Sequence, residues 1–113
     1  MYNIVHYLDA HGKDHYQDWF DALKDRQAQV AIIQRLARLA LGLFGDRKFI
    51  RSGIHELRID VGTGYRLYYA QVGKTLVLLT CGGTKKTQSK DVELAIKFLL
   101  DWKARHGRNA PLP

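Results

Sequence analysis

The fold class is predicted from residues 55–81, which read HELRIDVGTGYRLYYAQVGKTLVLLTC. Apolar and polar side chains alternate in residues 55–61, and this period of two is typical of a strand with one buried face. A second strand is predicted for residues 65–70, after a glycine-rich turn, and a third for residues 75–81, which are almost wholly apolar. We therefore expect an antiparallel meander of three strands, with the third strand covered on both faces.

Helical periodicity surrounds this meander. Residues 13–23 and 26–44 are predicted to form two amphipathic helices joined as a hairpin, and residues 90–106 a last helix. The stripe expected to face the core in the second helix comprises Ile33, Leu36, Ala37, Ala40 and Phe44. Together with a first strand at residues 2–8, these elements predict a single α+β domain over residues 1–113.

The connections are predicted from turn residues and charge. Residues 45–53 contain three basic residues and are expected to form a loop, and Gly82-Gly83-Thr84 is expected to end the third strand. A short polar tail ends with Pro111 and Pro113.

The net positive charge is concentrated in the second part of the chain. Residues 1–45 hold equal numbers of basic and acidic side chains, so residues 46–113 carry the whole net charge of +7. Such a balance predicts a polyanionic partner, a nucleic acid or an acidic protein, although a solvated surface also accounts for it. The single Cys81 closes an apolar run and is expected to be a core residue, which fits a reducing cytoplasm. The sequence has no apolar run long enough to cross a membrane and no secretory signal, so no membrane partner is expected.

The alternation places charged residues on one face of the meander. Glu56 and Arg58 share a face with Arg66 and Tyr68 of the next strand, and we expect this face to be exposed. Arginine binds phosphate through a bidentate fork and a tyrosine ring stacks on a base, so the face is a candidate RNA-binding surface. Simple cross-strand ion pairs on a solvated face are the alternative interpretation.

Further polar residues flank this face. Those proposed to contact RNA are Lys48 and Arg51 from the basic loop, and Lys85, Lys86, Gln88 and Lys90 after the third strand. The histidines and the cysteine lack the spacing of a metal site, the glycines do not form a phosphate-binding loop, and no hydrolase triad is indicated. No metal or cofactor is therefore expected.

One string of residues resembles a known family. Glu56-Leu57-Arg58, Gly64-Tyr65-Arg66-Leu67-Tyr68-Tyr69, Gly82-Gly83-Thr84-Lys85-Lys86-Thr87-Gln88 and Asp91 together resemble the RelE/ParE toxin superfamily, in its HigB-like, phage-derived Gp49-like branch of addiction module killer proteins. The likeness covers nearly the whole chain and includes the order of predicted elements.

The resemblance implies an endoribonuclease that cleaves messenger RNA at the ribosome and inhibits translation in the cytoplasm. It implies that Arg66 binds phosphate and stabilises the transition state, with Arg58 and Lys85 as further basic members of the catalytic set. Two positions depart from RelE itself: Glu56 replaces a lysine, and Asp91 falls near a functional tyrosine. We assign Glu56 as a candidate general base, Lys85 or its neighbour Lys86 to the phosphate or leaving group, and Tyr68 to base stacking.

The resemblance leaves two other functions open. Superfamily members of the ParE type poison DNA gyrase with the same fold, and a non-catalytic protein that only binds an antitoxin is a third possibility. In each case the implied partner is an antitoxin, usually a small helix-turn-helix protein of the HigA type. The toxin–antitoxin complex is expected to bind operator DNA through the antitoxin.

Overall fold

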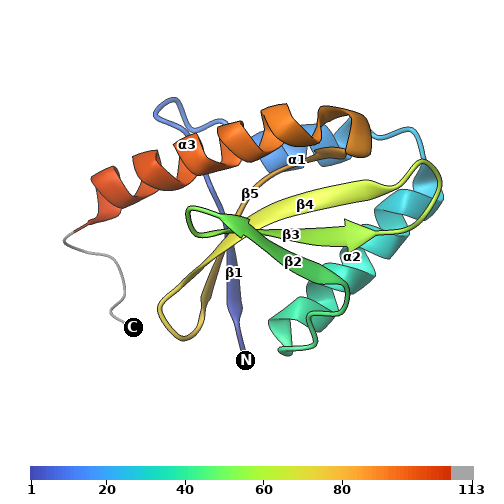
Figure 1. The fold of residues 1–113 in the computed structure, drawn as a ribbon, viewed down its shortest axis with the longest axis horizontal. Coiled ribbons are helices and arrows are strands. Elements are labelled where there is room, and N and C mark those ends of the chain that lie inside the picture. Colours follow the sequence, from blue (N-terminus) through green and yellow to red (C-terminus); the bar gives the residue numbers. More distant parts are fainter. Residues whose placement is uncertain (108–113) are drawn as a thin grey trace.

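The computed structural model describes residues 1–107, in which three α-helices pack on the two faces of a five-stranded sheet (Figure 1). The elements in chain order are β1 (Asn3–His6), α1 (His15–Asp21), α2 (Arg26–Ala40), β2 (Arg47–Arg51), β3 (Ile54–Ile59), β4 (Tyr65–Val72), β5 (Leu76–Thr84), a 3₁₀ turn η1 (Lys85–Thr87) and α3 (Gln88–His106). The strand order is β1-β5-β4-β3-β2; β1 is parallel to β5, and the other pairs are antiparallel. This confirms the predicted α+β class and the meander. The predicted tail ending at Pro111 and Pro113 lies outside the described residues.

Side-chain caps and a glycine set the ends of the helical hairpin. Asp14 accepts a hydrogen bond from the Gln17 amide at 2.9 Å, and Asp25 accepts one from the Ala28 amide at 3.0 Å. Each bond satisfies an amide that the first turn of a helix leaves free. Gly42 adopts a positive φ of 83°, so α2 ends at Ala40 and does not extend to residue 44 as predicted.

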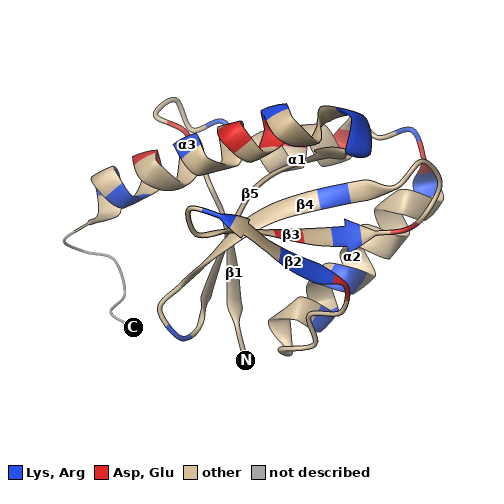
Figure 2. Ribbon diagram, viewed as in Figure 1, with Lys and Arg blue, Asp and Glu red and all other residues tan. Residues whose placement is uncertain are grey.

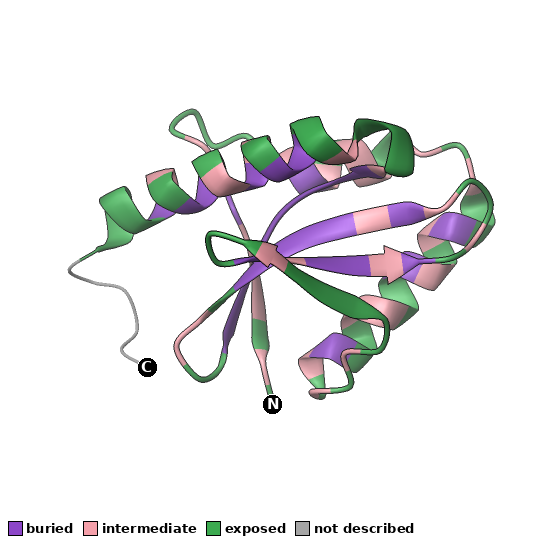
Figure 3. Cartoon of the chain, in the orientation of Figure 1, coloured by how far each residue is buried: buried purple, intermediate pink, exposed green. Residues whose placement is uncertain are grey.

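The sheet is buried on both faces (Figure 3). On the face toward α1 and α2, here called the hairpin face, Leu57, Leu67 and Val77 form a continuous apolar core with the two helices. On the opposite face, here called the α3 face, Ile54 and Leu78 pack beneath the buried side of α3. In Figure 1, α3 crosses in front of the sheet and the helical hairpin lies behind it. No helix within residues 1–107 is both long and apolar enough to span a membrane.

The predicted loop at residues 45–53 is wrong, because residues 47–51 form the edge strand β2. It pairs only with β3 and has a register shift between Phe49 and Arg51. An edge strand with exposed basic side chains lacks the apolar alternation that marks an interior strand, and such charges discourage edge-to-edge aggregation. The meander is therefore extended by a fourth antiparallel strand.

The predicted end of the third strand at Gly82-Gly83-Thr84 is also wrong, because β5 continues through Thr84. Glycine is required here by close approach from both faces. A Cβ on Gly82 would lie 2.5 Å from the Trp19 ring, and a Cβ on Gly83 would overlap the Asp91 carboxylate. Glycines in a strand can mark such contacts and not a strand end.

The predicted stripe of α2 is partly wrong. Ala28, Ile32 and Leu39 are the buried residues of this helix, whereas Ile33 is 57% exposed and Ala37 is exposed too. Since Ile32 and Ile33 are adjacent, the sequence fits two apolar stripes rotated by one residue, and the stripe that packs on the sheet is the one that contains Ile32.

Candidate functional site

The candidate site lies on the α3 face, where β3 and β4 meet the beginning of α3. Glu56 and Arg58 come from β3, Arg66 from β4 and Gln88 from the first turn of α3; together we call them the Glu56 site. Arg58 and Arg66 are direct cross-strand partners, so their side chains lie on the same face of the sheet. Two guanidinium groups in this register repel each other unless an anion lies beside them.

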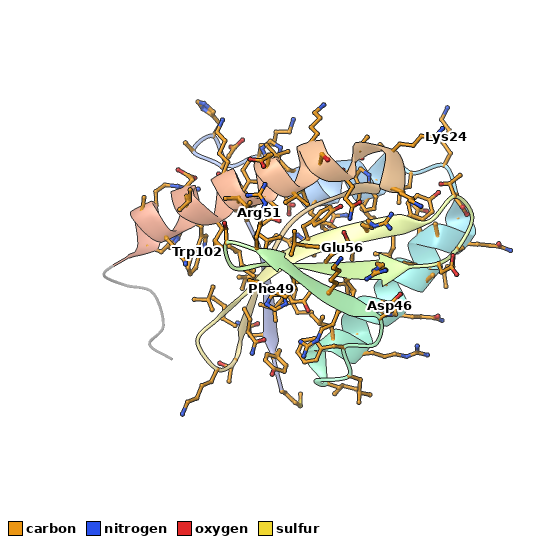
Figure 4. All side chains as sticks on the ribbon, in the orientation of Figure 1. Lys24, Asp46, Phe49, Arg51, Glu56 and Trp102 are labelled. Atoms are coloured by element: carbon orange, nitrogen blue, oxygen red, sulfur yellow. The ribbon has the colours of Figure 1, made fainter. Side chains whose placement is uncertain are left out.

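Glu56 supplies that anion. Its side chain is 1% exposed, and Oε1 lies 3.3 Å from Nε of Arg58 and 3.2 Å from Nε of Arg66. Its other oxygen, Oε2, accepts a hydrogen bond of 2.6 Å from Nε2 of Gln88. Figure 4 labels Glu56 on β3. The expectation of an exposed Glu56 is wrong, because the start of α3 covers the row of residues that alternation assigned to solvent.

The two arginines become more accessible toward the edge of the sheet. The side chain of Arg66 is 15% exposed and that of Arg58 is 39% exposed. Nε of each arginine is buried and has no aligned hydrogen-bond partner within residues 1–107, so each contact with Glu56 is described as an ion pair. A buried charge is stable only when it is paired, so the three groups depend on one another.

A hollow of about 240 Å³ opens beside the arginines. Its lining comprises Asp46, Arg58, Ile59, Asp60, Gly64, Tyr65 and Arg66. Nε of Arg58 lies 3.8 Å from Oδ1 of Asp46, a residue that precedes β2. The hollow therefore combines two guanidinium groups with two carboxylates at the solvent boundary.

Tyr68 has no surface on which a base could stack. It faces Cys81 and Glu56 in register and is completely buried beneath α3. Its hydroxyl has no hydrogen-bond partner within residues 1–107. Burial, reinforced by the Glu56 and Asp91 charges, raises the pKa of Tyr68 well above its ordinary value. The predicted stacking role is corrected, because alternation identifies residues on one face but does not show which helix covers that face.

Thr87 at the end of η1 and Asp91 in α3 also lie in this region. The face predicted from strand alternation did not include these two polar residues. Thr87 Oγ1 donates a hydrogen bond of 2.5 Å to Oδ2 of Asp91, and that carboxylate packs against Gly83, the register partner of Arg66. Burial raises the pKa of Asp91, while the Thr87 hydrogen bond lowers it. Their spacing of four residues, about one helical turn, is the feature of the sequence that could have predicted this contact.

The other predicted basic residues lie on β2, η1 and α3, elements on which Figure 2 shows lysine and arginine positions in blue. Lys48 on β2 is the register partner of Glu56 and is exposed. Lys85 and Lys86 are exposed in η1 and line a separate hollow with Thr63 and Thr84. Arg51 forms an ion pair with Glu93 of α3, and Lys90 is exposed on α3. The structure thus brings Glu56, Arg58, Arg66 and Gln88 into contact, with Lys48 in the next strand.

Cys81 confirms the expectation of a core residue, because it is buried and free. Burial raises the pKa of its thiol to about 12. Within residues 1–107, no three or more histidine, cysteine, aspartate or glutamate residues are grouped so that they could hold a metal ion.

The chain is similar to a described protein family and to a protein of Haemophilus influenzae. The model of the family described as phage derived protein Gp49-like (DUF891) matches residues 18–98, which include all of the Glu56 site. An uncharacterized protein of Haemophilus influenzae is 46% identical over 80 residues, which cover 71% of this chain and 81% of that protein.

Proposed function

The chain belongs to the phage-derived Gp49-like protein family, and from this premise and the geometry of the Glu56 site we propose that it is a toxin of the RelE type, in the HigB-like branch, that cleaves messenger RNA. The observation that carries the proposal is the placement of Arg58 and Arg66 as direct cross-strand partners around one buried carboxylate. Two guanidinium groups and one carboxylate leave one net positive charge, which complements the single negative charge of a phosphodiester.

The reaction we propose is attack of a ribose 2′-oxygen on the adjacent phosphorus. The new 2′-oxygen–phosphorus bond forms as the bond to the 5′-oxygen breaks, which leaves a cyclic phosphate and a 5′-hydroxyl end. A base takes the 2′-hydroxyl proton, an acid protonates the 5′-oxygen, and positive charge stabilises the dianionic transition state. Preorganised charge is the largest of these contributions in many enzymes.

Each charged residue has a distinct role in this proposal. Arg66 and Arg58 bind the phosphate and stabilise its developing charge. Asp46 and Asp60, the carboxylates lining the hollow beside them, are the candidate proton acceptors. Glu56 holds the arginines and is not the base, because both of its oxygens are already engaged.

The lysines extend the positive surface. Lys85 or Lys86 protonates the leaving oxygen or contacts the next phosphate, and Lys48, Arg51 and Lys90 bind the flanking RNA. Gln88 fixes Glu56 from α3 and thereby couples the helix to the arginines. These contacts make the binding of RNA electrostatic, and its affinity is expected to fall with salt.

The proposal also includes partners. The toxin acts on the translating ribosome in the cytoplasm, and an antitoxin of the helix-turn-helix type neutralises it. The antitoxin carries the operator-binding surface of the complex.

The test is to add the purified chain to a cell-free bacterial translation reaction and map new 5′ ends on a defined messenger. We expect cuts within translated codons, absent when Arg66→Ala replaces the wild type. Lys74→Ala is the matched control, because it removes an exposed positive charge in the turn at the far end of β4 and β5. Intact messenger with the wild type would refute the proposal, and loss of supercoiling activity in a gyrase assay would then identify a topoisomerase poison.

A further inference from the structure

Helix α2 carries an apolar stripe on the side turned away from the sheet. Val30, Ile33 and Leu41 are 49%, 57% and 59% exposed, and exposed Ala37 lies between them. Their spacing of three, four and four residues places them along one side of the helix and its C-terminal cap. Single exposed apolar residues are ordinary on a protein surface, but a continuous stripe marks an interaction site. We call these four residues the α2 stripe.

The inner side of the same helix is already fully used. Ala28, Ile32 and Leu39 are buried against the sheet and α1 (Figure 3). Arg35 also points inward, where Nη1 donates a hydrogen bond of 2.6 Å to the Arg58 carbonyl and Nη2 donates one of 3.0 Å to the Phe44 carbonyl. The stripe is therefore a second apolar side and not a displaced part of the core.

We propose that the α2 stripe binds an amphipathic α-helix of another protein, whose flanks carry carboxylates. A row of apolar side chains at intervals of three and four residues along a helix is the surface that a second helix packs against. The partner helix lays its apolar side on Val30, Ile33, Ala37 and Leu41. Because aspartate and glutamate are absent from α2, complementary charge must come from the partner.

Charge also selects against a second copy of this chain. Arg26 and Arg38 are exposed on α2 and form no salt bridge within residues 1–107. Two copies paired through this side would bring four guanidinium groups into one interface without a carboxylate from either helix. Like charges at an interface repel each other and oppose pairing, whereas acidic flanks on a partner would be attracted to the same arginines.

The stripe is separate from the Glu56 site. The hairpin and α3 lie on opposite faces of the sheet, and the Glu56 site is on the α3 face (Figure 1). A partner bound to the stripe leaves the Glu56 site open. The inference therefore stands independently of the proposed ribonuclease activity.

The test uses two designed, labelled helical peptides with leucine at the a and d heptad positions. One has glutamate at the flanking positions and the other lysine, and binding is measured by fluorescence anisotropy. We expect the glutamate peptide to bind the wild type at least about tenfold more tightly than the lysine peptide, a difference of about 1.4 kcal/mol. Equal affinity of the two peptides, or no binding of the glutamate peptide, would overturn the proposal.

Variants then locate the binding. Ile33→Ser, and Val30→Ser as a second variant, should weaken binding of the glutamate peptide about tenfold. Leu100→Ser should leave the affinity unchanged, because Leu100 is an exposed apolar residue on α3, away from the stripe. The double variant Arg26→Glu and Arg38→Glu should reverse the preference in favour of the lysine peptide. The proposal would be contradicted if Ile33→Ser and Val30→Ser, shown to be folded by circular dichroism, bound the glutamate peptide with the affinity of the wild type. The proposal would also be contradicted if sedimentation showed that the wild type is a dimer and that Ile33→Ser is a monomer. A second copy of this chain would then be the occupant of the stripe.

Discussion

The two faces of the sheet are built from alternate residues of the same strands, but they bury different chemistry. On the hairpin face, Leu57 and Leu67 meet Ile32 in an apolar core. On the α3 face, the adjacent residues Glu56 and Arg66 are held in an ionic cluster at the end of an otherwise apolar core. The hairpin face is thus stabilised mainly by close packing of apolar side chains, whereas one end of the α3 face retains desolvated charges that require partners. We therefore propose that this end of the sheet is its functional part.

The largest effect on stability should come from the hairpin face. Leu67→Ala removes a fully buried side chain from β4. The cavity and lost burial should lower the free energy of unfolding by about 2–5 kcal/mol. Urea denaturation monitored by circular dichroism measures this loss, and a cost near zero would show that the core can collapse around the change.

Loss of the buried anion should affect both stability and activity. Glu56→Gln keeps the shape of the side chain but removes the counter-charge of Arg66 and leaves Arg58 with its 3.8 Å contact to Asp46. We expect a loss of about 1–3 kcal/mol in the free energy of unfolding. Messenger cleavage should fall as well, because the guanidinium groups separate. The matched control is Glu93→Gln, whose carboxylate is 68% exposed and pairs with Arg51. An unchanged cleavage rate in a folded Glu56→Gln variant would remove Glu56 from its proposed positioning role.

Gly82 and Gly83 are successive residues of β5 that lie on opposite faces of the sheet, so substitutions at these positions test the two faces separately. Gly82→Ala should push Trp19 away on the hairpin face, and Gly83→Ala should displace Asp91 on the α3 face. Overpacking of this kind costs about 1–3 kcal/mol in either case. We expect only Gly83→Ala to lower messenger cleavage beyond its effect on stability, as measured at a temperature where both variants are folded. Equal loss of cleavage in the two variants would mean that the faces are not functionally distinct.

A smaller, pH-dependent effect should come from Cys81. Burial raises the pKa of the folded-state thiol to about 12, above its ordinary value in an unfolded chain. The neutral thiol therefore contributes stability that is complete below about pH 8.5 and is lost as the pH rises toward 12. Cys81→Ala should flatten this alkaline loss, as followed by denaturation at several pH values. Val77→Ala, a buried change on the hairpin face, should leave the slope unaltered.

Sequence patterning predicted the elements that have a buried side and missed those that do not. Alternation around Leu57 and Leu67 identified β3 and β4, whereas β2 has no buried period and its residues were interpreted as a basic loop. Asp14 and Asp25 lie immediately before α1 and α2, as their role as N-caps requires. The position of Gly42 relative to the end of α2 depends on a backbone conformation that the apolar period does not reveal.

The sequence predicted that Glu56, Arg58 and Arg66 share one face of the sheet, but it did not predict how that face is covered. Alternation placed Glu56, Arg58 and Arg66 on one face, and the structure brings them together. Alternation contains no information on which helix covers a face, so Glu56 and Tyr68 were expected to be exposed and are buried. The contact between Gln88 and Glu56 spans 32 residues of sequence, and local patterning does not predict such a contact.

If Arg58 and Arg66 act as one unit on the phosphate, a double-mutant cycle on messenger cleavage will show that their contributions are coupled. Cleavage rates at one mapped codon are measured in the translation reaction for the wild type, Arg58→Ala, Arg66→Ala and the double variant. We predict a loss of about 10²–10³-fold for Arg66→Ala, the size expected when one transition-state contact is removed. The double variant should lose little more, because residues that act as a unit are not additive. A wild-type rate in either folded single variant, or fully additive losses, would contradict the account.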